Sequence, residues 1–262
     1  MQLAVLPDQL AEAEHAPLPL GDPDPVQTAI PPVVPKNAPA DDTPADQVIE
    51  WAARTYAGQK IAATTGFGME GCALLDLINE AGLSIPVIWL DTGFLFEETH
   101  ELRRRLEKRY PRLSFERHAF DLTPTEQSIA LGPRLWERDP DRCCGLRKVV
   151  PMRRAMTDVD VWLTALRRGQ SPERAKLPVV SRDGQHDVWK VCPLLTWSRP
   201  QIWQYVRDHD VPYNVLHERE YPTVGCTHCT RSVPGSRPDS YSREGRWQNT
   251  AKTECGLHGG GI

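Results

Sequence analysis

The 262-residue sequence lacks several features that are typical of membrane, exported and nucleic-acid-binding proteins. No apolar run approaches the roughly 20 residues that a membrane-spanning helix needs, and the N-terminal stretch MQLAVLPDQLAEAEHAP has no basic segment ahead of an apolar one. Basic residues are not in excess, because 31 Lys and Arg stand against 35 Asp and Glu, a formal net charge of -4. We therefore expect a cytoplasmic protein with no membrane span and no nucleic acid partner.

Apolar periodicity is also missing from both ends of the chain. Residues 1–44 are rich in Pro, Ala and Asp, as in PLPLGDPDP, and such a composition rarely buries enough apolar surface to fold alone. We expect a disordered tail there, with an ordered arm across a partner subunit as the alternative. The pattern becomes irregular and glycine-rich after Val211, so we expect a single domain over residues 45–235 and a mobile C-terminal tail over residues 236–262.

Between these tails, predicted strands alternate with predicted helices. The runs KIAATT and IPVIWL are typical of strands, and each precedes a helical pattern, CALLDLINEAG and EETHELRRRLEKRY. Later in the chain, Ser198 and Pro200 are typical of the first turn of a helix over SRPQIWQYVRDHD. This alternation predicts an α/β fold, a parallel twisted sheet with flanking helices and right-handed crossovers.

Two loops, GFGMEG and DTGFLFEE, follow the first two predicted strands. Ligands of parallel sheets bind beyond the carboxyl ends of the strands, where glycine lets the backbone approach phosphate and a helix N-terminus supplies N–H groups. The sequence therefore predicts a nucleotide pocket here. The first loop matches neither the P-loop nor the G-x-G-x-x-G pattern, so a plain structural turn stays open as the alternative.

Four of the seven cysteines form two pairs. Cys226 and Cys229 have C-x-x-C spacing and Cys143 and Cys144 are adjacent, so two segments offer four thiolates to a metal group. Zinc also accepts such a set and is the commoner occupant on ligand identity alone. Neighbouring side chains reach one tetrahedral ion with difficulty but can bind different irons of a cube, so we favour an iron-sulfur cluster. A redox dithiol, or a helix start with one buried thiol, stays open for each pair.

The other three cysteines differ from these. Cys72 and Cys192 lie in apolar runs and are expected in the core. Cys255 lies in ECGLH near the C-terminus, where an exposed thiol could visit two partners and His258 or an arginine could lower its pKa. An incidental terminal thiol is the alternative for Cys255.

Basic side chains also occur where an anionic substrate would need them. Arginine forks match phosphate and sulfate oxygens, and lysine offers a compact charge. The arginines of ELRRRLEKR are instead expected to be solvated along a helix. The candidates for an anion site are Arg147, Lys148, Arg167, Arg168, Arg243 and Arg246.

Together these motifs resemble the assimilatory sulfonucleotide reductases of the PAPS reductase family, specifically the iron-sulfur type that reduces adenosine 5'-phosphosulfate. The resemblance runs from about Asp46 to His258. It departs from the usual family pattern at Met69 and Gly71 of the first loop. It rests, in the family's order, on GFGMEGCALLDL, WLDTGFLFEETHEL, CCGLRKVVPMRRAM, LRRGQSPERAKLPVV, KVCPLLTWSRPQIWQYVRDHDVPYNVLHE, GCTHCTR and ECGLH.

The resemblance implies an adenine nucleotide alpha hydrolase-like fold and thioredoxin-dependent reduction of adenosine 5'-phosphosulfate to sulfite and AMP, in sulfate assimilation and cysteine biosynthesis. Cys255 would be the nucleophile that forms a thiosulfonate, which reduced thioredoxin would then cleave. A [4Fe-4S] cluster would bind Cys143, Cys144, Cys226 and Cys229. Substrate contacts would come from Gly66, Phe67, Gly68, Glu70, Asp91, Thr92, Gly93, Lys148, Arg167, Arg243, Arg246 and His258.

Three alternatives stay open beside this prediction. The substrate could be 3'-phosphoadenosine 5'-phosphosulfate, since one more phosphate needs only an added cation or a missing clash. The chain could be an adenylyl-transferring nucleotide hydrolase of the same fold, or a binding module that zinc stabilises through the four cysteines. No motif encodes an interface, so the sequence decides neither for nor against a homo-oligomer.

Overall fold

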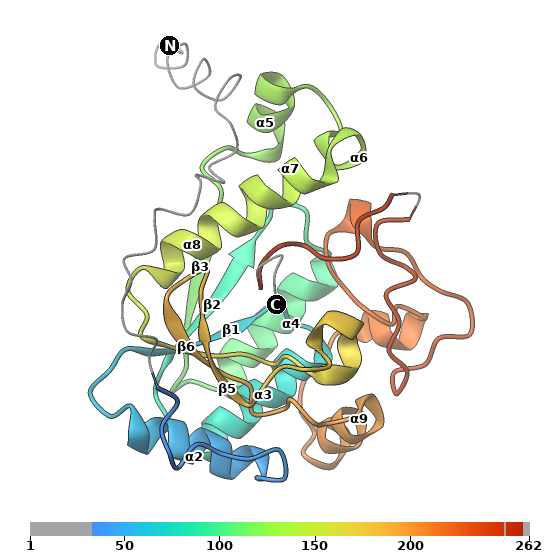
Figure 1. Ribbon diagram of the computed structural model, residues 1–262. Helices are drawn as coiled ribbons and strands as arrows, with labels where there is room; N and C mark the ends of the chain where they lie inside the picture. Colours follow the sequence, from blue (N-terminus) through green and yellow to red (C-terminus); the bar gives the residue numbers. More distant parts are fainter. Residues whose placement is uncertain (1–32, 249, 259–262) are drawn as a thin grey trace.

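The protein is described by a computed structural model that covers residues 33–248 and 250–258 (Figure 1). The predicted N-terminal tail therefore lies outside the described residues from 1 to 32. Its last part, residues 33–44, is irregular chain that contacts the domain, because Arg168 donates to the Asp41 carboxylate at 2.8 Å and the Thr196 hydroxyl donates to the Asp41 carbonyl at 3.3 Å. No helix of the described residues is long and apolar enough to cross a membrane.

One six-stranded sheet, in the order β3-β2-β1-β4-β6-β5, forms the centre of the molecule. Its first five strands in this order pair in parallel, and β5 pairs antiparallel with β6 at the edge. The predicted α/β fold, a parallel sheet with flanking helices, is confirmed except at the antiparallel edge strand β5. The strands are β1 (Ile61–Thr65), β2 (Pro86–Asp91), β3 (Ser114–Ala119), β4 (Val161–Leu163), β5 (Val180–Asp183) and β6 (Val188–Val191).

The antiparallel edge is a hairpin that the sequence analysis did not predict. The Asp183 carboxylate at the end of β5 accepts hydrogen bonds from the backbone N–H groups of Gln185 and His186, at 3.2 and 3.0 Å. An aspartate that binds the backbone two or three residues ahead stabilises a tight turn. The short loop then returns the chain alongside β5.

Helices cover both faces of the sheet (Figure 1). Because side chains alternate across a strand, Ala63 and Leu163 contribute to the large core under one helical layer, while Ala62 and Trp162 pack against Met152 on the other face. Each large apolar side chain buried in this way stabilises the fold by roughly 1.5–3 kcal/mol. The larger core involves α2 (Ala45–Thr55), α3 (Met69–Glu80), α4 (Glu97–Arg109) and α9 (Arg199–Asp208), and the smaller one α8 (Val150–Met156).

Shorter helices connect β3 to α8. The first of them has a complete capping box, in which Thr123 and Glu126 satisfy each other's backbone N–H groups. Ser198 caps α9 in the same way with Gln201, which confirms the predicted helix start. The connecting elements are α5 (Pro124–Leu131), α6 (Leu135–Arg138), α7 (Pro140–Cys144) and a π-helical turn over Gly145–Val149.

The strand order creates a crevice between β1 and β4. From β1 the chain builds outward through β2 and β3 on one side, and β4 lies on the other side. In doubly wound sheets the ligand site lies at this reversal, beyond the carboxyl ends of the strands. The fold therefore places any ligand next to the loops that follow β1 and β4.

The packing of α3 against α9 and the end of α4 depends on a buried carboxylate. Asp76 accepts hydrogen bonds from the Tyr110 and Tyr205 hydroxyls at 2.8 and 2.7 Å. We expect Asp76→Ala to lower the free energy of unfolding by about 2–4 kcal/mol, because it leaves two hydroxyl groups without their acceptor. Urea unfolding under anaerobic conditions checks this. Glu80→Gln, an exposed change at the end of the same helix, is the control, and an equal loss in both variants would contradict the prediction.

Candidate active site

A cavity of about 280 Å³ opens at the crevice that the strand order creates. Its walls come from the ends of β1 and β4, at Thr64 and Thr164, and from Thr92 just after β2. The C-terminal segment closes another side with Cys255 and His258. The cavity thus joins the predicted nucleotide loops to the cysteine that the sequence singled out.

Of the thirteen residues that the resemblance implies as nucleophile or substrate contacts, nine line this cavity and four do not. Phe67 is buried and packs edge-on against Trp89 at 5.6 Å, because its backbone has a φ of 58° that turns the side chain into the core. The Asp91 carboxylate is used by the Gly93 N–H at 2.9 Å and by Arg117 at 2.8 Å. The residues that line the cavity are Gly66, Gly68, Glu70, Thr92, Lys148, Arg243, Arg246, Cys255 and His258; those that do not are Phe67, Asp91, Gly93 and Arg167.

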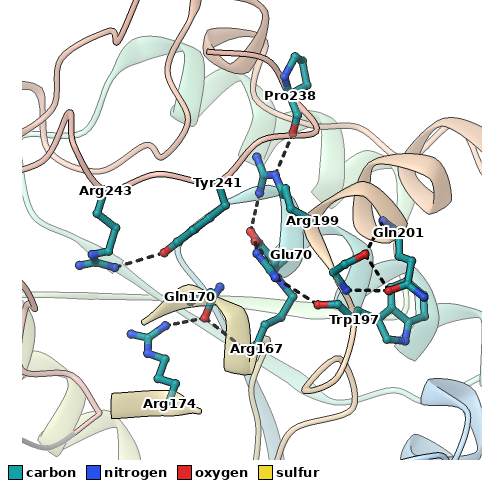
Figure 2. Close-up of polar contacts among 11 residues, drawn as sticks. Glu70, Arg167, Gln170, Arg174, Trp197, Arg199, Gln201, Pro238, Tyr241 and Arg243 are labelled. Carbon is teal, nitrogen blue, oxygen red and sulfur yellow. Dashed lines mark hydrogen bonds and ion pairs between the residues drawn. The ribbon is translucent and has the colours of Figure 1, made fainter. Parts of the chain in front are cut away.

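Arg167 is absent from the cavity wall because a buried carboxylate holds it (Figure 2). Its Nη2 donates to Glu70 Oε1 at 2.7 Å, and Arg199 donates to Glu70 Oε2 at 2.9 Å. Arg167 also donates to the Trp197 carbonyl at 3.1 Å, so its guanidinium is largely used. We call Glu70, Arg167 and Arg199 the charge triad. Its geometry indicates that Glu70 and Arg167 hold loops together rather than contact an anion.

The two guanidinium groups of the charge triad determine whether the Glu70 carboxyl is ionised. Burial raises the pKa of the Glu70 carboxyl, but the Arg199 and Arg167 guanidinium groups together outweigh burial and lower it to about 2. The carboxylate is therefore ionised at neutral pH. A buried ion of this kind is stable only when opposite charges surround it, and here both Glu70 carboxylate oxygens accept hydrogen bonds from guanidinium groups.

The four predicted metal ligands lie together in a second, smaller pocket. Cys143 and Cys144 end α7. Cys226 precedes the 3-10 turn over Thr227–Cys229, and Cys229 ends that turn. The Thr227 N–H donates to the Phe94 carbonyl at 2.8 Å, which holds the C-x-x-C loop against the loop after β2. Two segments distant in sequence thus bring four thiols to one place.

The chemistry of this pocket fits an iron-sulfur cluster. Burial, and next the neighbouring Cys144, Cys226 and Cys229, raise the pKa of the Cys143 thiol to about 12. Four crowded thiols of this kind bind a metal group by giving up their protons, since thiolates are the ligands. In the described residues no group of three or more His, Cys, Asp or Glu side chains is already arranged around a single ion. The donor set and the shared pocket suit a group that binds several thiolates.

Aromatic side chains form one wall of the cysteine pocket. The His228 ring stacks on Trp136 with centroids 3.9 Å apart and an interplanar angle of 7°, and Phe94 meets both rings edge-on. Arg147 lies over Phe94 and donates to the Thr92 carbonyl at 2.8 Å. Arg147, a candidate anion ligand in the sequence, is thus buried as part of this wall.

Lys148 connects the two pockets because it lines both of them. Burial lowers the pKa of its ammonium group, but the nearby Cys226, Cys255 and Cys144 side chains outweigh burial and raise it. Lys148 therefore carries a positive charge between the cysteine pocket and the cavity. This is the position in which a cation would contact an anionic substrate.

The C-terminal segment lies across the cavity as irregular chain. The His258 ring stacks on Trp162 with centroids 5.1 Å apart, and Leu257 packs beside the smaller core. Glu254 accepts hydrogen bonds from Arg174 and Arg243. These contacts place the Cys255 thiol, which is half-buried, in the cavity wall.

Several lining residues were missed by the sequence analysis, among them Trp162, Arg174, Arg199 and Tyr241. Arg174 belongs to the stretch LRRGQSPERAKLPVV that carries the family resemblance, and that stretch was its only signal. Trp162 sits in an apolar strand, where a large aromatic is usually core. Both are visible as site residues only once β4 and the C-terminal segment are placed side by side.

The chain is similar to known proteins over most of its length. The model of the phosphoadenosine phosphosulfate reductase domain matches residues 60–232. The chain is 46% identical over 211 residues to an adenosine 5'-phosphosulfate reductase of Halalkalibacterium halodurans. The aligned region covers 80% of this chain and 90% of the relative. It is 42% identical over 211 residues to adenosine 5'-phosphosulfate reductase 2 of Bacillus subtilis, with 80% and 88% covered.

Solved structures resemble the fold. The phosphoadenylyl-sulfate (PAPS) reductase from Candida auris, in its phosphate complex, superposes with a TM-score of 0.63 at 29% identity, over 73% of this chain and 91% of that one. A mutant of the Candida glabrata FMN adenylyltransferase superposes with a TM-score of 0.52 at 17% identity, over 72% of this chain and 63% of that one. At that identity the second likeness shows the fold alone.

The charge triad predicts a pH-dependent contribution to stability. We expect Glu70→Gln to lower the free energy of unfolding at neutral pH by about 3–5 kcal/mol, because two buried guanidinium groups lose their counter-charge. The pKa of Glu70 is lowered by folding, so its stabilisation is complete above the ordinary value of 4.5 and is lost as the pH falls towards about 2. The difference between wild type and variant should therefore narrow over that range.

Urea unfolding at about pH 7 and about pH 3 measures this difference. The control is Asp121→Asn, which breaks an exposed ion pair with Arg154 of 2.8 Å and should cost less than about 1 kcal/mol. A pH-independent difference for Glu70→Gln would contradict an ionised carboxylate in the triad.

Proposed function

The chain belongs to the phosphoadenosine phosphosulfate reductase family, and on that premise we propose that it reduces adenosine 5'-phosphosulfate to sulfite and AMP in sulfate assimilation. The observation that carries the proposal is that Cys255 and Lys148 line the cavity at the β1–β4 crevice. A thiol and a cation thus meet in the place where this fold binds nucleotides. The two bacterial relatives named above bear the name of this reductase at 42% and 46% identity.

The substrate we propose is adenosine 5'-phosphosulfate, the nucleotide without a 3'-phosphate. The Candida auris PAPS reductase is more distant, at 29% identity, than the bacterial adenosine 5'-phosphosulfate reductases. The 3'-phosphorylated nucleotide is the second candidate. An adenylyl-transferring activity has less support, because the FMN adenylyltransferases share only the fold.

In the first step the Cys255 thiolate would attack the sulfur of the sulfate group. A bond forms between Cys255 Sγ and that sulfur while the bond from sulfur to the bridging oxygen breaks, and AMP leaves with the electron pair. Lys148, Arg243 and Arg246 line the cavity and would neutralise the charge that develops on the phosphate oxygens. The residues therefore align the reactants and stabilise charge, and they need not hold an electron carrier for this step.

In the second step a thiol of reduced thioredoxin would attack Cys255 Sγ and expel sulfite. The resulting mixed disulfide would be resolved by the second thioredoxin thiol, so thioredoxin gives up two electrons and Cys255 is restored. All seven cysteines are free in the structure, as a reducing compartment such as the cytoplasm maintains. We propose thioredoxin as the partner and the cytoplasm as the location on this chemistry.

We further propose that Cys143, Cys144, Cys226 and Cys229 hold a [4Fe-4S] cluster. Bound there, the cluster would supply a large fixed charge that tunes the electrostatic field around Lys148. Besides the proposed cluster, the Cys226 thiol has the Thr92 hydroxyl as a partner, 3.3 Å from its Sγ. Lys148 and Thr92 would then connect the cluster to the substrate cavity.

Sulfite release tests the function. We expect purified anaerobic protein with reduced thioredoxin to release sulfite from adenosine 5'-phosphosulfate and at least about 10-fold more slowly from the 3'-phosphorylated nucleotide, a difference of about 1.4 kcal/mol. Cys255→Ser should bind AMP as wild type does but release no sulfite and gain no sulfo group by intact mass. Thioredoxin-dependent sulfite from that variant would refute the nucleophile, and faster release from the 3'-phosphorylated nucleotide would reverse the substrate assignment.

Metal content tests the cluster. We expect wild-type protein prepared without oxygen to be brown and to contain iron and acid-labile sulfide, and Cys226→Ser to lose most of both. Cys72→Ala is the matched control, because Cys72 is fully buried in the core and its variant should keep the metal. A colourless wild type that contains zinc would instead support the zinc-stabilised module.

A further inference from the structure

Arg174 is a buried arginine that the proposed reaction does not use. It is 5% exposed and ends the 3-10 turn over Pro172–Arg174. Its Nη1 donates to Gln170 Oε1 at 2.5 Å, and the same oxygen accepts the Arg167 backbone N–H at 3.1 Å (Figure 2). Gln170 therefore fixes one side of the guanidinium from within the domain.

The free side of this guanidinium faces the C-terminal segment. Arg174 Nη2 lies 3.1 Å from each of the two Glu254 carboxylate oxygens. Glu254 directly precedes Cys255 in the sequence. Arg174 thus binds the segment one residue before Cys255. The stacking of His258 on Trp162 holds the segment three residues after Cys255.

Arg243 is only a secondary partner of Glu254. Its Nη2 lies 3.3 Å from Glu254 Oε2 and donates more closely to the Thr253 carbonyl, at 2.8 Å. Its Nη1 has a long contact of 3.4 Å with the Tyr241 hydroxyl, and its Nε has no hydrogen-bond partner among the described residues. Arg174, which binds both Glu254 oxygens, is therefore the main partner that holds the segment.

We propose that Arg174 and Glu254 form a latch that positions the Cys255 thiol in the cavity for attack on the substrate. The latch rests on the proposed function, since it presumes that Cys255 is the nucleophile. Neither residue needs to touch the reacting atoms, so both are positioning residues. The argument is geometric, because a misplacement of about 1 Å in a reacting group can cost about 100-fold in rate.

The test measures the first step alone. Holoprotein is mixed anaerobically with adenosine 5'-phosphosulfate and no thioredoxin, and the gain of one sulfo group on Cys255 is followed by intact mass. We expect Glu254→Gln and Arg174→Gln each to slow this step by at least about 10-fold, and the double variant to be no slower than either single one, since both remove the same contact. The charge-reversed pair Arg174→Glu with Glu254→Arg should recover at least about fivefold over the single variants.

Binding and accessibility separate positioning from other roles. AMP affinity should stay within about twofold of wild type in Glu254→Gln, while alkylation of Cys255 by iodoacetamide becomes faster because the segment is released. Glu254 lies on the irregular segment, so this variant stays informative even where Arg174→Gln does not fold. Glu244→Gln, an exposed carboxylate earlier in the same segment, is the control and should react at the wild-type rate.

Three results would overturn the latch: unchanged sulfonation rates in both single variants, additive losses in the double variant, or AMP affinity that falls in parallel with the rate. These outcomes differ from failure of the proposed function. If wild type gains no sulfo group at all, the nucleophile itself is wrong. If wild type and Glu254→Gln gain it equally fast, only the latch is wrong.

Discussion

The buried carboxylate of Glu70 is the constraint on which the rest of the site depends. It lies in the first turn of α3, next to the loop after β1, and it binds Arg167 from the loop after β4 and Arg199 from the start of α9. An ion in this position is tolerated only because both guanidinium groups surround it. One charge thus fixes the relative positions of three segments, and all three contribute to the cavity wall.

The same triad extends its influence to the C-terminal half. Arg199 Nε donates to the Pro238 carbonyl at 2.8 Å, and Arg167 lies 5.3 Å from the Tyr241 ring, so the segment that leads to Cys255 begins on the triad. Further along, the backbone N–H of Trp247 donates to the Cys229 carbonyl at 3.2 Å, which joins that segment to the cysteine pocket. The substrate cavity, the proposed cluster and the tail are consequently one connected structure.

Sequence patterns predicted what depends on local order and missed what depends on long-range pairing. Strand and helix alternation predicted the parallel sheet, and cysteine spacing predicted which thiols would meet. A loop carboxylate, however, can bind a ligand or pair with other side chains of the protein. Glu70 pairs with Arg199, which lies 129 residues away, so no local pattern reveals the pairing. Arg174 was missed for the same reason, since Glu254, which explains its burial, is 80 residues distant.

These pairings also decide how much positive charge is left for a substrate. Five Lys and Arg side chains line the cavity among the described residues: Lys148, Arg174, Arg199, Arg243 and Arg246. Glu254 mainly engages Arg174, and the single charge of Glu70 is shared between Arg167 and Arg199. The other lining cations are Lys148, Arg243 and Arg246. That remainder suits a phosphate and a sulfate that carry one negative charge each.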